Sequence, residues 1–112
     1  MSDSIIDWEL AIRLAGNSRK SAEEMLMQLM KELPHELVKI KSDYAIFDFI
    51  ALKRRLHSLH GALCYCGAPR FKNAVAELEQ AIIHKQFQLL SSLLAQFEFE
   101  ANQLINQIIS LA

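Results

Sequence analysis

Residues that make turns are scarce in this chain. Its 112 residues include only three glycines and two prolines. An all-β sandwich or barrel needs many tight turns, so this scarcity argues against that fold class. The glycines, Gly16, Gly61 and Gly67, are also too far apart for a glycine-rich phosphate loop or a dinucleotide-binding fingerprint. The sequence therefore argues against nucleotide binding by those two routes.

An excess of charge of one sign is also missing. Twelve lysines and arginines stand against 13 aspartates and glutamates, which gives a formal net charge of −1. A surface that binds nucleic acid or an anionic membrane needs a basic field or a polybasic block, and the sequence has neither. We therefore expect no nucleic acid partner and no direct membrane contact.

Long hydrophobic runs and cysteines are rare as well. No apolar stretch approaches the roughly 18 residues of a membrane-spanning helix, and the start, MSDSIIDWEL, is too acidic for a signal peptide. The two cysteines, Cys64 and Cys66, would point about 200° apart on one helix, so they cannot pair there. Two thiols also do not make a zinc site. We expect a cytoplasmic chain with reduced, buried cysteines and no metal or cofactor.

Apolar residues at helical spacing are abundant. They make up 52% of the chain, which is enough to bury a core. Four stripes with spacings of three and four residues predict four amphipathic helices, and a shorter one precedes them. The expected helices cover about 7–15 with Asp7 as N-cap, about 18–44, a segment after the N-cap Asp48, a segment from Pro69, and a segment from Phe87.

Short breaks between these stripes indicate the topology. They lie at Gly16, Gly67 and residues 84–85, and no linker or low-complexity tract intervenes. Pro34 lies inside the second helix and predicts a kink near residues 30–33. These breaks argue against an extended coiled coil. We therefore predict one all-α domain over residues 1–112, an antiparallel up-down four-helix bundle with a short additional N-terminal helix that closes one end.

Four histidines are candidates for chemistry, because imidazole titrates and acts as a nucleophile near neutral pH. His35 and His84 lie near helix ends or polar stretches and are interpreted as surface residues. His57 lies about 120° from the centre of its leucine stripe, which places it on the exposed flank. Gly61, one turn later, costs roughly 1 kcal/mol relative to alanine inside a helix. Either a partner approaches closely there, or the surface simply tolerates the glycine.

A longer pattern surrounds His57. Residues 48–69 read DFIALKRRLHSLHGALCYCGAP. The run HSLHG at 57–61, followed by Gly67, resembles the H-x-L-[KH]-G signature of histidine phosphotransfer (HPt) domains. The resemblance extends to DWELAIRLAGNS, to ELPHEL and to the turn after Gly67, so it covers nearly the whole chain. The form LHGxxxYxGxPR is similar to C-terminal HPt domains of hybrid sensor kinases of the BarA/GacS type.

This resemblance implies a phosphorelay role in two-component signal transduction. In HPt domains an exposed histidine accepts a phosphoryl group from a receiver-domain aspartate and passes it to the aspartate of a response regulator. By motif position that histidine is His57. The acidic pocket and the Mg²⁺ belong to the receiver, so this chain needs no cofactor. The expected partners are the receiver domain of a hybrid sensor kinase and the receiver domain of a response regulator.

Supporting roles are implied for neighbours of His57. His60 stands where many family members have a lysine, whose charge would help neutralise the phosphoryl group; alternatively it is a border residue without a role. Gly61 would leave room for the receiver. Across the hairpin, Glu77, Glu79 or Gln80 could hydrogen-bond Nδ1 of His57 and leave Nε2 free to react, and we favour Gln80.

Two further residues are candidates for receiver docking. Arg54 would be a cationic contact close to His57. Ile50, two turns before His57 on the same face, is either an apolar docking contact or a residue covered by the first helix. The chain itself is expected to be a monomer, because its apolar stripes are satisfied within the bundle.

Competing interpretations make different predictions. A structural helical adaptor with an incidental His57 would bind a receiver without becoming phosphorylated. In a histidine kinase dimerisation helix an acidic residue normally follows the histidine, whereas Ser58 follows here, so we expect no autokinase activity. A metal site at His57 and His60 lacks further ligands. The sequence leaves open whether this is a free-standing protein or the cytoplasmic C-terminal domain of a membrane-bound sensor kinase.

Overall fold

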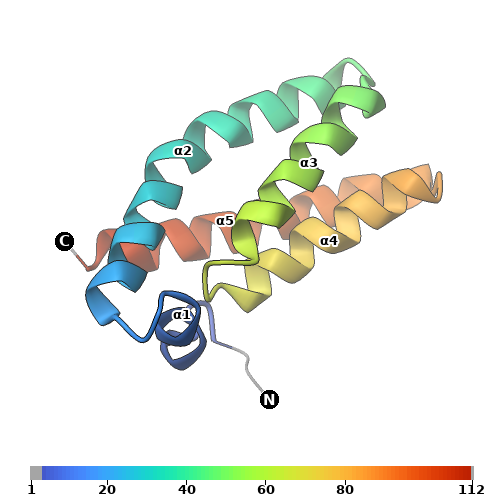
Figure 1. Ribbon diagram of the computed structural model, residues 1–112. Helices are drawn as coiled ribbons and strands as arrows, with labels where there is room; N and C mark the ends of the chain where they lie inside the picture. The colour runs from blue at the N-terminus through green and yellow to red at the C-terminus, as the bar shows by residue number, and fades with distance from the viewer. Residues whose placement is uncertain (1–3, 112) are drawn as a thin grey trace.

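The computed structural model describes residues 4–111, so residues 1–3 and 112 of the predicted domain lie outside the described part. Within that part the chain forms helices and no strand, which confirms the all-α prediction. The elements, shown in Figure 1, are α1 (Trp8–Leu14), α2 (Arg19–Ala45), α3 (Phe49–Leu63), α4 (Pro69–Ile83), the 3₁₀ turn η1 (Phe87–Leu89) and α5 (Leu90–Ile109).

The four long helices form the predicted up-down bundle. Each of α2, α3 and α4 packs against the next helix in the chain, and α5 packs back against α2. Because the connections are short, consecutive helices run antiparallel, as Figure 1 shows. The ring of α2, α3, α4 and α5 encloses one core, and α3 lies between α2 and α4.

Side-chain caps fix where the helices begin. Asp7 Oδ1 accepts a hydrogen bond from the backbone N–H of Leu10, and Asp48 Oδ1 accepts one from Ala51, both at 3.1 Å. Each satisfies one of the donors that a helix N-terminus leaves unpaired. Both residues are therefore the N-caps that the sequence predicted.

The proline in α2 does not end the helix. α2 continues across Pro34 from Arg19 to Ala45, although proline removes one bond of the backbone ladder. Figure 1 shows the helix curving along its length. Pro34 therefore lies inside one continuous helix of 27 residues.

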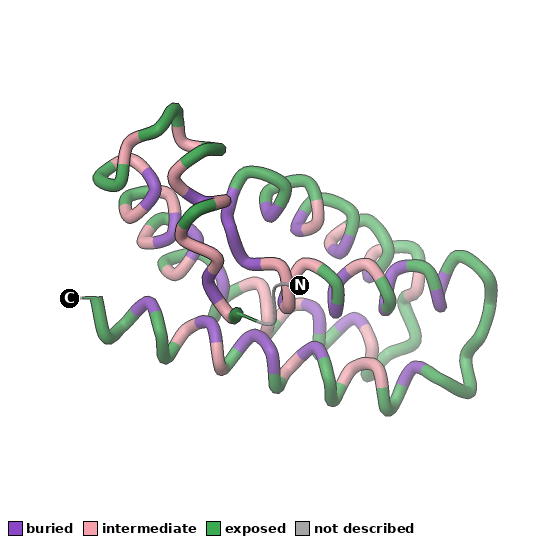
Figure 2. The backbone as a smooth tube through the Cα atoms, turned by 90° about the horizontal axis from the view of Figure 1, so that it is seen from below, coloured by how far each residue is buried: buried purple, intermediate pink, exposed green. Residues whose placement is uncertain are grey.

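Most members of the predicted stripes lie in the core, and the exposed ones are Phe87 and Leu111 at the two ends of the last stripe. Figure 2 shows buried positions recurring along the inward side of each long helix. Phe87, however, is 47% exposed, because it lies in η1 and α5 begins only at Leu90. Cys64 is also exposed, at the C-cap of α3, so the prediction that both cysteines are buried is wrong for this one. Cys66 is buried, and this burial raises the pKa of its thiol.

The short helix α1 closes the end of the bundle where α3 meets α4. The backbone N–H of Asp7 donates to the carbonyl of Gly67 at 2.8 Å. A Cβ on Gly67 would lie 2.5 Å from the Asp7 carbonyl oxygen and 2.7 Å from the Ala11 Cβ. Only glycine permits this close approach, so the role of Gly67 is to seat α1.

Candidate functional site

His57 is held on the outer face of a firmly packed helix. Helix α3 buries one leucine stripe, and His57 lies outside it with 78% of its side chain exposed. The buried members of the stripe are Leu52, Leu56, Leu59 and Leu63. The prediction that His57 lies on the exposed flank of its helix is therefore confirmed, and the imidazole is accessible to another molecule.

A buried carboxylate holds one edge of the imidazole. Glu79 Oε2 on α4 lies 3.0 Å from His57 Nδ1, and the Glu79 side chain is only 10% exposed. A carboxylate can only accept a hydrogen bond, so this contact assigns the proton to Nδ1. Nε2, the other ring nitrogen, then keeps its lone pair and is left as the nucleophile.

The sequence favoured Gln80 as the residue that hydrogen-bonds to His57, and this prediction is wrong. Gln80 is exposed, and its Oε1 lies 3.2 Å from Nε2 of His84, one turn further along α4. Successive residues of a helix point about 100° apart, so only one residue in this stretch can face α3. The structure selects Glu79 from the three candidates Glu77, Glu79 and Gln80.

An open groove of about 510 Å³ borders the imidazole. Its walls come from α3 and α4, and they combine two cations with apolar side chains: Ile50, Lys53, Arg54, His57, Ser58, Glu79 and Ile83. Lys53 and Arg54 are exposed and form no ion pair with any residue in the described part of the chain. Their positive charge is therefore available to an anion beside His57.

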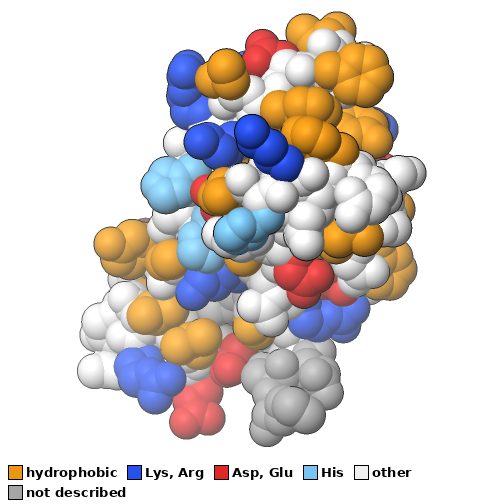
Figure 3. Space-filling view, turned by 90° about the vertical axis from the view of Figure 1, so that its right-hand side faces the viewer, with side chains coloured by type: hydrophobic (Ala, Val, Ile, Leu, Met, Phe, Trp, Pro, Cys, Tyr) orange, Lys and Arg blue, Asp and Glu red, His pale blue; other side chains and the backbone are white. Residues whose placement is uncertain are grey.

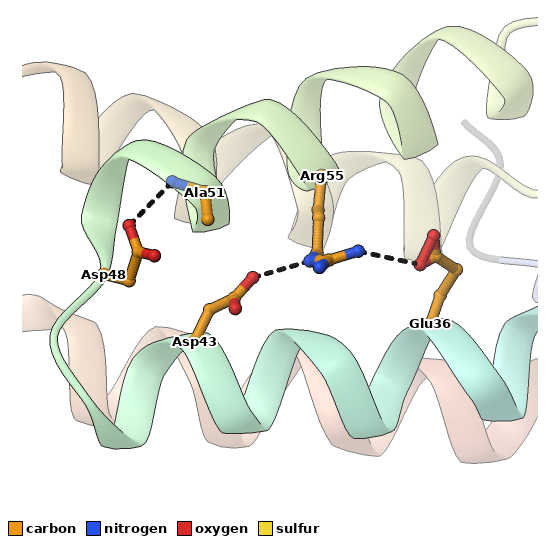
Figure 4. A network of polar contacts seen from close by, with 5 residues as sticks. All are labelled: Glu36, Asp43, Asp48, Ala51 and Arg55. Atoms are coloured by element: carbon orange, nitrogen blue, oxygen red, sulfur yellow. Dashed lines mark hydrogen bonds and ion pairs between the residues drawn. The ribbon is translucent and has the colours of Figure 1, made fainter.

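The next residue, Arg55, is used differently. Its Nε donates to Asp43 Oδ2 at 2.6 Å, and its Nη1 lies 3.9 Å from Oε2 of Glu36. Figure 4 shows the arginine reaching from α3 to Glu36 and Asp43 on α2. This pair ties α3 to α2 on the side away from Glu79, so it holds in place the helix that carries His57.

The remaining motif residues follow His57 along α3. His60 is partly buried, at the border that helical geometry predicted. Gly61 is exposed, and a Cβ added there would meet no atom within 4 Å. Nothing in the fold therefore requires glycine at position 61, in contrast to position 67. Neither His60 nor Gly61 lines the groove.

Ile50 lies at the other end of α3 from α1. It is 74% exposed and lines the groove, so the alternative that α1 covers it is wrong. Figure 3 views the end of the bundle where α2 turns into α3; hydrophobic side chains gather there, and lysine, arginine and histidine side chains lie beside them. The exposed histidine thus has cationic and apolar neighbours on one face.

Two features of the site were missed by sequence reasoning. Glu79 was only one of three candidates, because counting across a hairpin gives the partner to within about one residue. Lys53, which lines the groove, was not among the candidates. The signal for both was present in the sequence, because Lys53 lies one turn before His57 and Glu79 is the middle one of the three candidates across the hairpin.

Two further kinds of feature were sought in residues 4–111, clusters of metal ligands and membrane-spanning helices. Within them no group of three His, Cys, Asp or Glu side chains is placed to hold a metal ion. In the same part of the chain, no helix combines the length and apolar character needed to cross a membrane.

Comparisons with known proteins agree with this geometry. The Hpt domain family matches residues 24–110. The chain is 34% identical over 80 residues to the signal transduction histidine-protein kinase BarA of Shigella flexneri, a match that covers 71% of the chain and 9% of BarA. It is 36% identical over 75 residues to the sensor protein GacS of Pseudomonas syringae pv. syringae, which covers 67% of the chain and 8% of GacS.

A solved structure resembles the whole fold. It is the crystal structure of the HPT domain of a sensor hybrid histidine kinase from Shewanella, with a TM-score of 0.83 and 27% sequence identity. The superposition covers 96% of this chain and 92% of that domain, whereas the chain spans only about a tenth of the length of the sensor kinases it matches. The chain therefore belongs to the Hpt domain family and has a phosphorelay role in two-component signalling.

Proposed function

We propose that His57 is the residue that carries the phosphoryl group. The observation behind this proposal is an exposed imidazole that lines the open groove and whose Nδ1 is held by Glu79 at 3.0 Å, which leaves Nε2 without a partner among the described residues. Nε2 attacks the phosphorus of a receiver's aspartyl phosphate. A bond forms between Nε2 and phosphorus, the phosphorus–oxygen bond breaks, and the aspartate leaves as a carboxylate. Transfer to a second receiver reverses these events.

Glu79 has two roles in this step. Before transfer, its carboxylate accepts a hydrogen bond from Nδ1–H and so fixes the reactive tautomer. During transfer, positive charge develops on the ring as Nε2 bonds to phosphorus. A carboxylate at 3.0 Å stabilises that charge, and it does so without reorganising because α4 already holds it in place. Glu79 is thus a positioning residue that acts through the imidazole.

The cations next to the groove balance the incoming group. Arg54 and Lys53 precede His57 by three and four residues on α3, so their side chains lie on its side of the helix. Both are free of acidic partners within the described residues and can attract a phosphoryl group carrying negative charge. His60, where related domains have a lysine, supplies a further charge only when it is protonated. Because Gly61 has no side chain, the surface next to His57 has room for the receiver to approach.

The remaining chemistry belongs to the partners. The receiver supplies the Mg²⁺ and the acidic pocket, and this chain has no autokinase activity of its own. The donor is the receiver domain of a hybrid sensor kinase, and the acceptor is a response regulator. Residues 1–112 act as one cytoplasmic, monomeric domain, either alone or within such a kinase.

One labelling experiment tests the assignment. The purified chain is incubated with a receiver domain that carries ³²P on its aspartate, and the label is mapped. The expected product is acid-labile phosphohistidine at one position, lost in His57→Gln while the helical circular dichroism is kept. Label that persists in His57→Gln would refute the assignment. A folded parent that binds receivers without becoming labelled would favour the adaptor alternative.

A further inference from the structure

Both cysteines of the chain line one hollow of about 280 Å³ at the end of the bundle that α1 closes. Its other walls include Leu10 and Leu14 of α1 and Lys72 of α4. This hollow shares no wall residue with the groove beside His57. Cys64 and Cys66 therefore lie together in a part of the fold that the proposed phosphoryl transfer does not use.

The two thiols differ in their access to solvent. Cys64 is exposed, whereas Cys66 is buried and its Sγ donates a hydrogen bond to the carbonyl oxygen of Ala62 at 3.5 Å. Burial raises the pKa of the Cys66 thiol, so this group stays protonated inside the fold. An oxidant that arrives from solvent therefore meets Cys64 first, with a second thiol two residues away.

The backbone between the two cysteines is a turn and not a helix. Cys64 is the C-cap of α3, and Cys66 lies in the turn that leads to α4, so the geometry that keeps two helical residues apart does not apply. Cα atoms two residues apart are separated by at most about 7.6 Å, since each step is about 3.8 Å. Disulfides need about 4.4 to 6.8 Å. A local rearrangement of the turn can therefore bring the sulfur atoms together.

Such a rearrangement would reach α1 directly, because Gly67 is the next residue. The carbonyl of Gly67 accepts the backbone N–H of Asp7 at 2.8 Å, and the Gly67 Cα lies so close to α1 that even a Cβ would not fit. Packing as close as this transmits strain when the backbone moves. A disulfide would also remove the S–H that Cys66 donates to Ala62. The state of the two thiols is thus coupled to the seat of α1.

We propose that Cys64 and Cys66 are a redox-modified pair, which a peroxide oxidises to a disulfide that loosens α1 from the bundle. The sulfur of Cys64 bonds to one peroxide oxygen, the oxygen–oxygen bond breaks, and a sulfenic acid and one water form. The sulfur of Cys66 then bonds to that of Cys64, and the sulfur–oxygen bond breaks. The hydroxyl leaves with the Cys66 proton as a second water. A dithiol reverses the change, as in the transient disulfides of redox-sensing proteins.

Trp8 reports whether α1 is seated. It is the only tryptophan of the chain, it lies on α1 against the core, and the guanidinium carbon of Arg19 on α2 is 3.7 Å from its ring centroid. The full chain is treated with a slight excess of hydrogen peroxide while the Trp8 emission is recorded. Free thiols are then blocked with iodoacetamide, and the mass of the tryptic peptide 56–70 is measured, which contains both cysteines and no methionine. Cys64→Ser and Cys66→Ala are treated in the same way.

In the parent, the peptide should escape blocking and weigh two hydrogen atoms less than the dithiol form, and the Trp8 emission should shift to longer wavelength. Dithiothreitol should reverse both changes, and neither should occur in Cys64→Ser or Cys66→Ala. A peptide that gains oxygen instead, or a covalent dimer through Cys64, would overturn the pair. A disulfide with unchanged Trp8 emission would overturn its link to α1. None of these results depends on phosphoryl transfer, so failure of the proposed function is detected separately.

Discussion

The two buried carboxylates that contact α3 from opposite sides have different partners. Asp43 on α2 is 8% exposed and Glu79 on α4 is 7% exposed. Asp43 pairs with Arg55, a guanidinium that is always charged and mostly covered, whereas Glu79 contacts the open imidazole of His57. The first pair is permanent, and the second leaves one nitrogen free. One side of α3 therefore fixes the helix, and the other holds the proposed phosphorylation site.

The largest effect should come from breaking the permanent pair. Arg55→Leu would leave Asp43 buried without its cation, and Arg55 is about one third exposed, so we expect a loss of about 2 kcal/mol in the free energy of unfolding. His57→Leu leaves Glu79 without its hydrogen-bond donor, but that donor is itself exposed, so we expect a smaller loss of about 1 kcal/mol. Urea denaturation measures both. Equal losses would mean that the two sides of α3 do not differ in structural role.

A bulky side chain at Gly61 should damage the chemical side only. Gly61→Glu should slow transfer from a receiver by about tenfold or more, because a displacement of about 1 Å can cost 10²-fold in rate. The fold should survive, since a Cβ there meets no atom within 4 Å and helix propensity improves. Gly61→Ala is the control, expected to be slightly more stable and to transfer nearly normally. Unchanged kinetics in a folded Gly61→Glu would show that receivers dock elsewhere.

Removing the charge of Glu79 should weaken the reactive pair without breaking the fold. Glu79→Gln keeps the shape, but its amide oxygen accepts a weaker hydrogen bond from Nδ1–H of His57, so labelling by the small phosphoryl donor phosphoramidate should fall about tenfold. Nitrogen chemical shifts of the ring should show a smaller share of the Nδ1-protonated tautomer. A purely structural Glu79 would change stability but not the tautomer, and that result would contradict its positioning role.

The smallest effect concerns His60. Lysine keeps its charge from about pH 6 to 8, whereas histidine is the side chain that changes charge in this range. His60→Lys should therefore make transfer less dependent on pH, by about two- to threefold at the alkaline end. Because the receiver also contributes to the pH dependence, the parent and the variant are measured with the same receiver and their profiles are compared. Parallel profiles would leave His60 as a border residue.

The fold was predictable because it follows from local patterns. The leucine stripe of α3 and the caps Asp7 and Asp48 depend on neighbours in sequence, and the structure confirms them. Contacts between helices were harder to predict from the sequence. Helical geometry exposes His57, but choosing Glu79 over Gln80 requires the rotation of α4 against α3, which no single-helix pattern contains. The exposure of Phe87 was missed for a similar reason, since a 3₁₀ turn interrupts the stripe.

The most direct test of the account is to identify the phosphorylated nitrogen. The chain is phosphorylated by its receiver or by phosphoramidate, and long-range proton–nitrogen NMR spectra of the histidine rings are recorded. The account predicts one modified ring, that of His57, with phosphorus on Nε2 and the proton of Nδ1 still donated to Glu79. Phosphorus on Nδ1, or on a residue other than His57, would contradict it.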